Sequence, residues 1–318
     1  VNKKDFSLSA SFNIGFNKNR VEKFKNGESN YKTYSSKWNG NSAAPFDDYI
    51  IREGEAVGQM YGYITGGMYT FDDFDYIGTG TYPYRLKGDT DGSKTEAAAS
   101  LIGAKYFGPG SLKLVDKDGN IATSTDAKTV IGNANPDLIG GFNLTARYKG
   151  FDLSAFFNFS IGNDVYNANK IDNSCYSGSR KYNNLVEEMK NRFTYIDPAT
   201  GYLAYNDPVR LAEINKNATI WSPYMTTAVL HSWAVEDGSF LRFNNLTLGY
   251  TFPKRWVKKL GLTNLRIYGT VYNVCVITGY SGFDPEVSTR NSTAMTPGVD
   301  YSAYPKSRSF IGGVNVSF

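Results

Sequence analysis

The 318-residue sequence is poor in the side chains that most often carry catalysis or bind metals, with one histidine, His231, and two cysteines, Cys175 and Cys275. A single histidine cannot serve both a catalytic triad and a metal cluster, so most histidine-based catalysis is excluded. We expect His231 to be a surface or packed residue. The cysteines lack CxxC spacing, which argues against a zinc site. We expect two unrelated free thiols, with a disulfide as the alternative.

An excess of charge of one sign and a long apolar run are also missing. The 34 Lys and Arg residues are scattered and nearly balanced by 30 Asp and Glu residues, which argues against a nucleic-acid-binding surface. No apolar stretch approaches the roughly 18–20 residues that a membrane-spanning helix needs. The first residues, Val1 to Lys4, contain no readable targeting signal. We therefore expect either a removed leader or the tail of a longer polypeptide.

What the sequence does contain is a repeated period of two. In the segment from residue 6 to 16, apolar residues occupy the even positions and Ser, Asn or Gly the odd ones. Successive side chains of a strand point to opposite faces, so this pattern predicts a strand with one apolar and one polar face. The apolar set is Phe6, Leu8, Ala10, Phe12, Ile14 and Phe16.

The same pattern recurs in residues 142–148 and 151–161, joined by Lys149-Gly150, which predicts a hairpin with a tight turn. Only Phe156 breaks the alternation of the second strand. Further strands are expected at 240–252, 264–275 and 308–318. A change of parity within the first of these predicts a β-bulge at Asn244-Asn245.

The length of these strands points to a membrane. Ten steps of about 3.3 Å span roughly 33 Å, which at a tilt of about 40° covers roughly 25 Å, the height of the apolar band of an outer-membrane barrel. We therefore predict that the apolar faces meet outer-membrane lipid and the polar faces line a water-filled lumen. The predicted lipid-facing residues are Phe6, Phe12, Phe157, Phe159, Leu246 and Leu248, and the predicted lumen-lining residues are Arg147, Asp152, Ser154 and Asn158.

About seven strands can be counted if residues 56–68 form one, which is too few for so polar a pore, so more barrel is expected outside this chain. The links at 149–150 and 253–263 are short, whereas 69–138, 162–236 and 276–306 are long and polar. Outer-membrane barrels have short periplasmic turns and long extracellular loops, and this chain fits that asymmetry.

The loop from 162 to 236 is rich in aromatic residues and asparagine, which suit sugars, peptides or a partner protein. The alternative is that these aromatics only pack the loop together. Two short helices are expected there, one after Asn184 and one capped by Asp207 before Pro208. The candidate substrate-binding residues are Tyr166, Asn167, Tyr176, Trp221 and Tyr224.

Asp116, Asp118 and Asn120 lie at alternate positions, as in the first half of a calcium-binding loop. The sixth position of such a loop should be Gly and is Ile121, and the twelfth is Ala127 in place of Glu. We expect a polar turn here, with a calcium ion as the alternative, and no other cofactor.

Several motifs together resemble a known family. They include Asn135-Pro136-Asp137, Tyr148-Lys149-Gly150-Phe151, Glu236-Asp237-Gly238-Ser239-Phe240-Leu241-Arg242, Ser281-Gly282-Phe283-Asp284-Pro285-Glu286 and the ending Val314 to Phe318. From about residue 5 onward these are similar to the C-terminal part of SusC/RagA-type TonB-dependent transporters of Gram-negative outer membranes. The chain departs from the family at Asn273-Val274-Cys275, where members often carry Asn-Leu-Phe.

The resemblance implies an all-β fold: the C-terminal portion of a roughly 22-stranded antiparallel barrel, with residues 1–318 as one segment and the plug domain and N-terminal strands absent. It implies a SusD-like surface lipoprotein as a lid and TonB, ExbB and ExbD as the energy source. Phe318 resembles the signal read by the barrel-assembly machinery.

The expected function is active import of a glycan or a peptide across the outer membrane, without enzymatic activity. Two alternatives are a secreted or surface β-rich carbohydrate-binding or adhesin domain, and a surface glycan hydrolase. The first predicts a chain that is soluble without detergent. The second predicts polysaccharide turnover that is lost when one carboxylate is changed.

Overall fold

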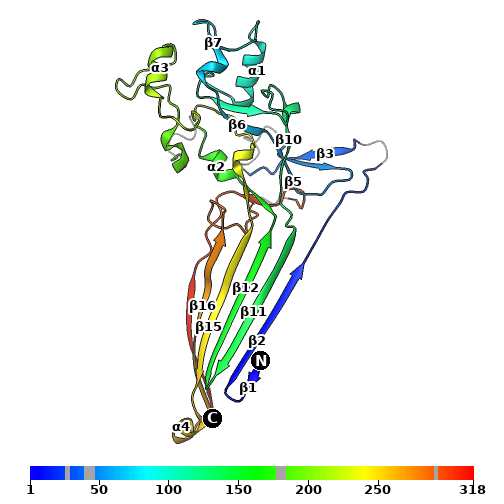
Figure 1. Ribbon diagram of the computed structural model, residues 1–318, viewed down its shortest axis with the longest axis vertical. Helices are drawn as coiled ribbons and strands as arrows, with labels where there is room; N and C mark the ends of the chain where they lie inside the picture. The colour runs from blue at the N-terminus through cyan, green and yellow to red at the C-terminus, as the bar shows by residue number, and fades with distance from the viewer. Residues whose placement is uncertain (26–28, 39–46, 177–183, 290–292) are drawn as a thin grey trace.

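The computed structural model describes residues 1–25, 29–38, 47–176, 184–289 and 293–318. A tall inclined sheet forms the lower part of the molecule, and a head of shorter elements sits at its upper end (Figure 1). All neighbouring strands of the tall sheet are antiparallel. In spatial order they are β1 (Asn2–Lys3), β2 (Phe6–Gly15), β11 (Leu138–Tyr148), β12 (Phe151–Ile161), β15 (Phe240–Thr251), β16 (Asn264–Thr278) and β18 (Ser309–Ser317).

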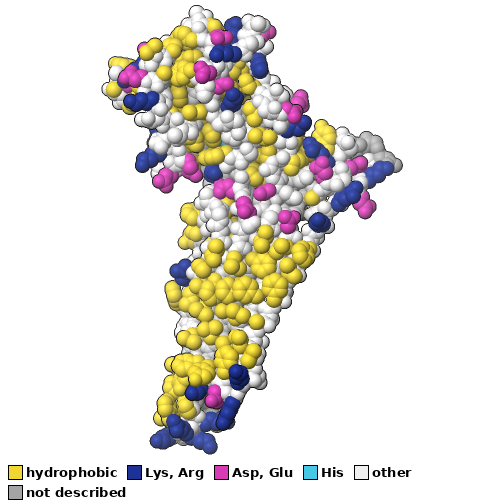
Figure 2. All heavy atoms as spheres, viewed as in Figure 1, with side chains coloured by type: hydrophobic (Ala, Val, Ile, Leu, Met, Phe, Trp, Pro, Cys, Tyr) yellow, Lys and Arg dark blue, Asp and Glu magenta, His cyan; other side chains and the backbone are white. Residues whose placement is uncertain are grey.

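The alternation predicted from the sequence is confirmed by the strand register. Phe12 is paired with Phe142, which is paired with Phe157, so that aromatic residues form a row across neighbouring strands. The Phe157 ring stacks on Phe142 at 4.4 Å and on Phe243 at 4.2 Å between centroids. This face is left open in the described chain, with Phe12 63% and Leu248 53% exposed. Figure 2 shows the result as a broad hydrophobic band over the sheet, with Lys and Arg side chains gathered at its lower tip.

The predicted β-bulge is also present. Phe156 pairs with Asn245 and Phe157 with Phe243, so Asn244 is the extra residue of β15. The neighbouring strand β16 is irregular at the same level, where Asn273 has a φ of 51°. The two irregularities lie side by side and keep the apolar residues above and below them on one face.

The lower end of the sheet carries only short connections. Lys149 and Gly150 form the predicted two-residue turn with φ values of 46° and 94°. An added Cβ at Gly150 would lie 2.7 Å from the Thr251 carbonyl oxygen, so glycine is required there. The second link contains α4 (Lys254–Val257) and the 3₁₀ helix η6 (Lys258–Leu260). Short turns thus lie at one end and all long connections at the other, as predicted.

The head begins earlier in the chain than we predicted. Residues 56–68 do not form one strand of the barrel sheet. They form β5 (Gln59–Gly62) and β6 (Ile64–Met68), which belong to two different small sheets of the head. Tyr63 between them is fully buried, and its backbone bonds Leu230 instead of a barrel strand. The seventh strand of the tall sheet is the short β1.

The head is built from four small sheets and short helices in the described residues. Their strands are β3 (Tyr31–Tyr34), β4 (Tyr49–Arg52), β5 and β10 (Thr129–Asn133); β13 (Asp164–Asn167), β14 (Val235–Asp237) and β17 (Val299–Asp300); β6 and β9 (Leu112–Val115); and β7 (Phe74–Tyr76) and β8 (Tyr84–Leu86). The α-helices are α1 (Ser93–Ile102), α2 (Ala168–Asp172) and α3 (Pro208–Ile214), and the 3₁₀ helices are η1 (Phe71–Asp73), η2 (Thr125–Ala127), η4 (Glu187–Asn191) and η5 (Ser232–Ala234).

Helix α3 begins as predicted, because the Asp207 side chain accepts a hydrogen bond from the Arg210 backbone N–H at 3.0 Å. The helix expected after Asn184 is the short 3₁₀ helix η4. Helix α1 was not predicted. None of the helices in the described ranges is long and apolar enough to cross a membrane.

Candidate functional site

The face of the tall sheet opposite the hydrophobic band carries mainly polar side chains. The predicted lumen-lining residues Arg147, Asp152, Ser154 and Asn158 all lie on this face, which we call the inner wall. Near the lower end of the wall, the Arg266 guanidinium donates two hydrogen bonds to the Asp152 carboxylate, from Nε to Oδ1 at 2.9 Å and from Nη2 to Oδ2 at 2.6 Å. The six predicted lipid-facing residues lie on the other face.

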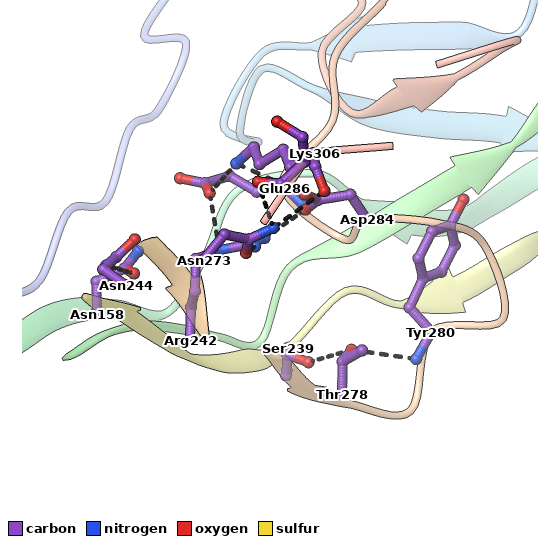
Figure 3. A network of polar contacts seen from close by, with 11 residues as sticks. Asn158, Ser239, Arg242, Asn244, Asn273, Thr278, Tyr280, Asp284, Glu286 and Lys306 are labelled. Atoms are coloured by element: carbon purple, nitrogen blue, oxygen red, sulfur yellow. Dashed lines mark hydrogen bonds and ion pairs between the residues drawn. The ribbon is translucent and has the colours of Figure 1, made fainter. Parts of the chain in front are cut away.

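Near its upper end, the inner wall is tied to the loop that follows β16 (Figure 3). Arg242 of β15 is 3% exposed, and its Nη2 lies 2.5 Å from Asp284 Oδ1. Its Nη1 donates to Asn273 Oδ1 at 3.0 Å, and its Nε forms an ion pair with Glu286 at 3.4 Å. Lys306 pairs with Glu286 at 2.5 Å and with Asp284 at 3.6 Å. This ion network fixes the loop against the wall.

A cavity of about 860 Å³ opens between the inner wall and this loop. Its polar lining includes Asn158 and Ser160 of β12, Asp164 of β13, and Glu286 and Ser288 of the loop. Burial raises the pKa of Asp164, although its Oδ2 accepts a bond from the Asn133 N–H at 2.7 Å. The cavity therefore offers both hydrogen-bond donors and acceptors to a solute that enters the upper end of the wall.

Two predicted substrate-binding residues are buried inside the head. Tyr166 is 1% exposed, and its hydroxyl accepts a bond from Trp38 Nε1 at 2.7 Å. Trp221 is also buried and packs edge-on against His231 and Trp233. Neither aromatic ring has a free face for a ligand in the described structure, so the burial favours the packing alternative for these two residues.

The other three candidates divide between two places. Tyr176 and Tyr224 meet edge-on at 5.7 Å at the surface of the head, where Tyr176 is exposed. Asn167 instead lies buried near the top of the wall and donates to Glu236 Oε1 at 3.0 Å. The five residues therefore do not form one site, and substrate contact stays a prediction for Asn167, Tyr176 and Tyr224.

The histidine, the two cysteines and the Asp116 turn each have a structural explanation. His231 is buried, and desolvation lowers its pKa to about 3, so it is neutral. Cys175 is buried, Cys275 is exposed, and they form no disulfide. Asp116 Oδ1 accepts bonds from the N–H groups of Asp118 and Asn120 at 2.9 and 2.8 Å, which forms the expected polar turn. The described ranges contain no group of three or more His, Cys, Asp or Glu side chains placed to hold a metal.

Sequence reasoning missed the ion network. The sequence places Arg242 in a strand and in one family motif, and Asp284 and Glu286 in another, without linking them. A signal was available, because an arginine among the Ser, Thr and Asn residues of a polar strand face needs an acidic partner once it is buried.

An antiparallel sheet with one open apolar face, one polar face and long connections at a single end defines a class of protein, the wall of a transmembrane β-barrel. Comparison with known proteins places the chain within that class. No family model matches it. It is 31% identical over 327 residues to TonB-dependent receptor P3 of Formosa agariphila, and 24% identical over 322 residues to TonB-dependent receptor SusC of Bacteroides thetaiotaomicron.

Two solved structures have the same fold over the whole chain. One is described as the RagAB peptide importer in the open-open state, with a TM-score of 0.65 and 21% identity. The other is the RagAB peptide transporter, with a TM-score of 0.63 and 22% identity.

These matches cover 99–100% of this chain but only 25–28% of each relative or solved chain. The chain thus spans about a quarter of the length of the proteins it matches. It is homologous to a segment of SusC/RagA-type TonB-dependent transporters, as its motifs predicted.

Proposed function

We propose that the 318 residues form part of the barrel of an outer-membrane transporter that imports a nutrient, a glycan or a peptide, with energy from TonB, ExbB and ExbD. The named relatives are receptors and transporters, and none is named as an enzyme. In this proposal the chain catalyses no reaction. It supplies a wall past which the solute moves.

One observation carries the proposal. The tall sheet leaves an apolar face open across its long strands, while the opposite face is polar and holds a bidentate ion pair. In water, such a face would be covered by a second layer, because burial of apolar area is the main driving force of folding. In a bilayer the apolar face meets lipid and the polar face a water-filled lumen.

The edges of the sheet support a larger barrel. In the described chain, β18 pairs only with β16, and β2 pairs with β1 through Phe6 and Ser7 only. Unpaired backbone groups are costly in lipid, where no water can satisfy them. We propose that strands outside these 318 residues complete the barrel, that a plug domain fills it, and that a SusD-like lipoprotein covers the head.

A surface adhesin or carbohydrate-binding domain is the alternative. It would require a protein layer over Phe12, Phe151 and Leu248, and the described residues provide none. The exposure of this face therefore favours the transporter.

The test compares two neighbouring residues of β15 that face opposite ways. Leu248→Arg places a charge toward lipid and is expected to cost about 2–4 kcal/mol and reduce folded protein in the outer membrane. Thr247→Arg, on the inner wall, is expected to leave assembly largely intact. Folding is measured by the heat-dependent gel shift of barrels and location by membrane fractionation. Equal tolerance of both variants contradicts the lipid-facing assignment.

Import itself is tested in cells with and without TonB. Uptake of a labelled neutral hexasaccharide and of a labelled hexapeptide is followed in cells that produce the full-length protein. The proposal expects that at least one is taken up only when TonB and the protein are both present. TonB-independent uptake, or none, contradicts it.

A further inference from the structure

The apolar exception in the alternation of β12, Phe156, lies on the inner wall beside another exposed aromatic residue. Phe156 pairs with Asn245, and Asn245 pairs with Tyr272, so these three residues form one row across β12, β15 and β16 on the same face. Phe156 is 39% and Tyr272 46% exposed. Strands lie about 4.8 Å apart, which places the two rings roughly 10 Å apart with the Asn245 amide between them. Two open aromatic rings on a polar wall point to a ligand with apolar faces.

The paired irregularities of β15 and β16 add amides at the same level. A regular strand would turn only one of two successive residues to the inner wall, but the bulge lets both Asn244 and Asn245 face it. Asn273, with its positive φ, contributes a third amide from the neighbouring strand. These residues line an open pocket of about 500 Å³ together with Phe156, Asn158 and Tyr272.

Some of these amide groups are available to a ligand. Asn244 donates to Asn158 Oδ1, which leaves Asn158 Nδ2 and Asn244 Oδ1 without a hydrogen-bond partner among the described residues. The side chain of Asn245 likewise makes no hydrogen bond within the described ranges. Figure 3 shows the Asn158–Asn244 pair beside Arg242 and Asn273, directly next to the ion network. A ligand would therefore meet a donor, an acceptor and a complete amide.

The charge of the pocket narrows the ligand class. All six lining residues are uncharged. Two cations contact the lining residue Asn273: Arg242, which is neutralised by Asp284, and the exposed Arg308, whose Nε donates to the Asn273 backbone oxygen at 3.2 Å. The lining side chains themselves offer a charged solute no counter-ion, whereas hydroxyl groups match amides and the apolar faces of sugar rings match open aromatic rings.

We propose that Phe156, Asn158, Asn244, Asn245 and Tyr272 form a subsite for a neutral oligosaccharide on its path along the inner wall. The inference deepens the proposed import function and rests on it, because only an importer passes its solute along this face.

The test measures ligand binding to the full-length protein, purified in detergent, by isothermal titration calorimetry. The probes are maltohexaose and cellohexaose as neutral glycans, hexagalacturonate as an acidic glycan, and an end-capped neutral hexapeptide. Phe156→Ala and Tyr272→Ala are each expected to weaken neutral-glycan binding about fivefold to tenfold. Tyr272→Phe keeps the ring and should bind nearly as the unchanged protein does. Phe151→Ala removes the same type of ring from the outer face of the same strand and serves as the matched control.

Each outcome decides the proposal. A loss confined to the inner-wall variants and to neutral glycans supports it. Preferred binding of the hexapeptide or of hexagalacturonate overturns the ligand class. Equal affinity in all variants, or no binding of a neutral glycan, overturns the subsite. Equal affinity is also the result expected if the two rings only pack against a plug domain. Because binding does not require TonB, normal glycan binding without TonB-dependent uptake would contradict the import proposal and leave the subsite proposal intact.

Discussion

Arg242 offers the sharpest test of how the loop after β16 is held. The change is Arg242→Met, which keeps much of the side-chain volume and removes the charge. Asp284 would then stay buried, and its remaining ion-pair partner would be Lys306 at the longer distance of 3.6 Å. Removal of one partner from a buried ion pair costs about 3–5 kcal/mol, because the other charge is left without compensation.

The expected result follows from that cost. If about 3 kcal/mol is lost from the closed loop, its open population rises by about a hundredfold. Hydrogen exchange measured by mass spectrometry should detect faster exchange at the backbone N–H of Glu286, which donates to Asp284, and of Ser281, which donates to Glu236. The strand β12 serves as an internal control and should exchange as before.

The double variant Arg242→Met with Asp284→Leu separates charge from packing. It removes both buried charges and should restore a large part of the protection at the Ser281 N–H, because uncompensated charge causes the loss. The Glu286 N–H loses its acceptor when Asp284 is replaced, so it is not used as a reporter in this variant. The reasoning is refuted if the single variant leaves loop exchange unchanged, or if the double variant is as open as the single one.

Three further predictions concern other parts of the chain. Burial raises the pKa of Asp48 to about 6, although hydrogen bonds from Ser36 lower it. Between about pH 4 and 6 the folded head therefore keeps the Asp48 carboxyl protonated while the unfolded chain does not. The free energy of unfolding should fall by on the order of 1–3 kcal/mol as the pH rises through 6. Thermal unfolding at several pH values should show this slope, and Asp48→Asn should flatten it; an unchanged slope would exclude Asp48 as its source. Gly150→Ala should lower the free energy of unfolding by about 1–2 kcal/mol and reduce the folded fraction in gel-shift assays, because Gly150 has a positive φ and lies close to the Thr251 oxygen. Lys149→Asn should be tolerated, because asparagine adopts a positive φ more readily than most residues. Equal folding of both variants would contradict this. Phe318→Ala should reduce the amount of barrel assembled in the outer membrane when both proteins are synthesised at the same level, as the family resemblance implies. Unchanged assembly in fractionated cells would refute the role of Phe318 in recognition by the barrel-assembly machinery.

Much of the tall sheet could be predicted because its information is local. Each strand shows its two faces through a period of two, so the hairpin at Lys149-Gly150 and the parity change at Asn244 could be read from adjacent residues. The N-cap Asp207 was found for the same reason, since a cap and its helix lie within a few residues of each other.

The head could not be predicted in this way. Its core joins residues far apart in sequence, such as Trp38 and Tyr166, which are 128 positions apart and share a hydrogen bond. An aromatic residue in a polar loop looks the same in sequence whether it packs in such a core or meets a ligand. For this reason the sequence predicts ligand contact for Tyr166 and Trp221, whereas both are buried in the structure.

The sequence alone determined which residues share a face and that one face suits lipid, because side-chain direction along a strand follows from backbone geometry. Only the tertiary structure decided which residues of different strands become neighbours. Strand register places Phe156, Asn245 and Tyr272 in one row, and folding of the loop brings Asp284 to Arg242. Such contacts depend on pairing between distant segments, which no local pattern encodes.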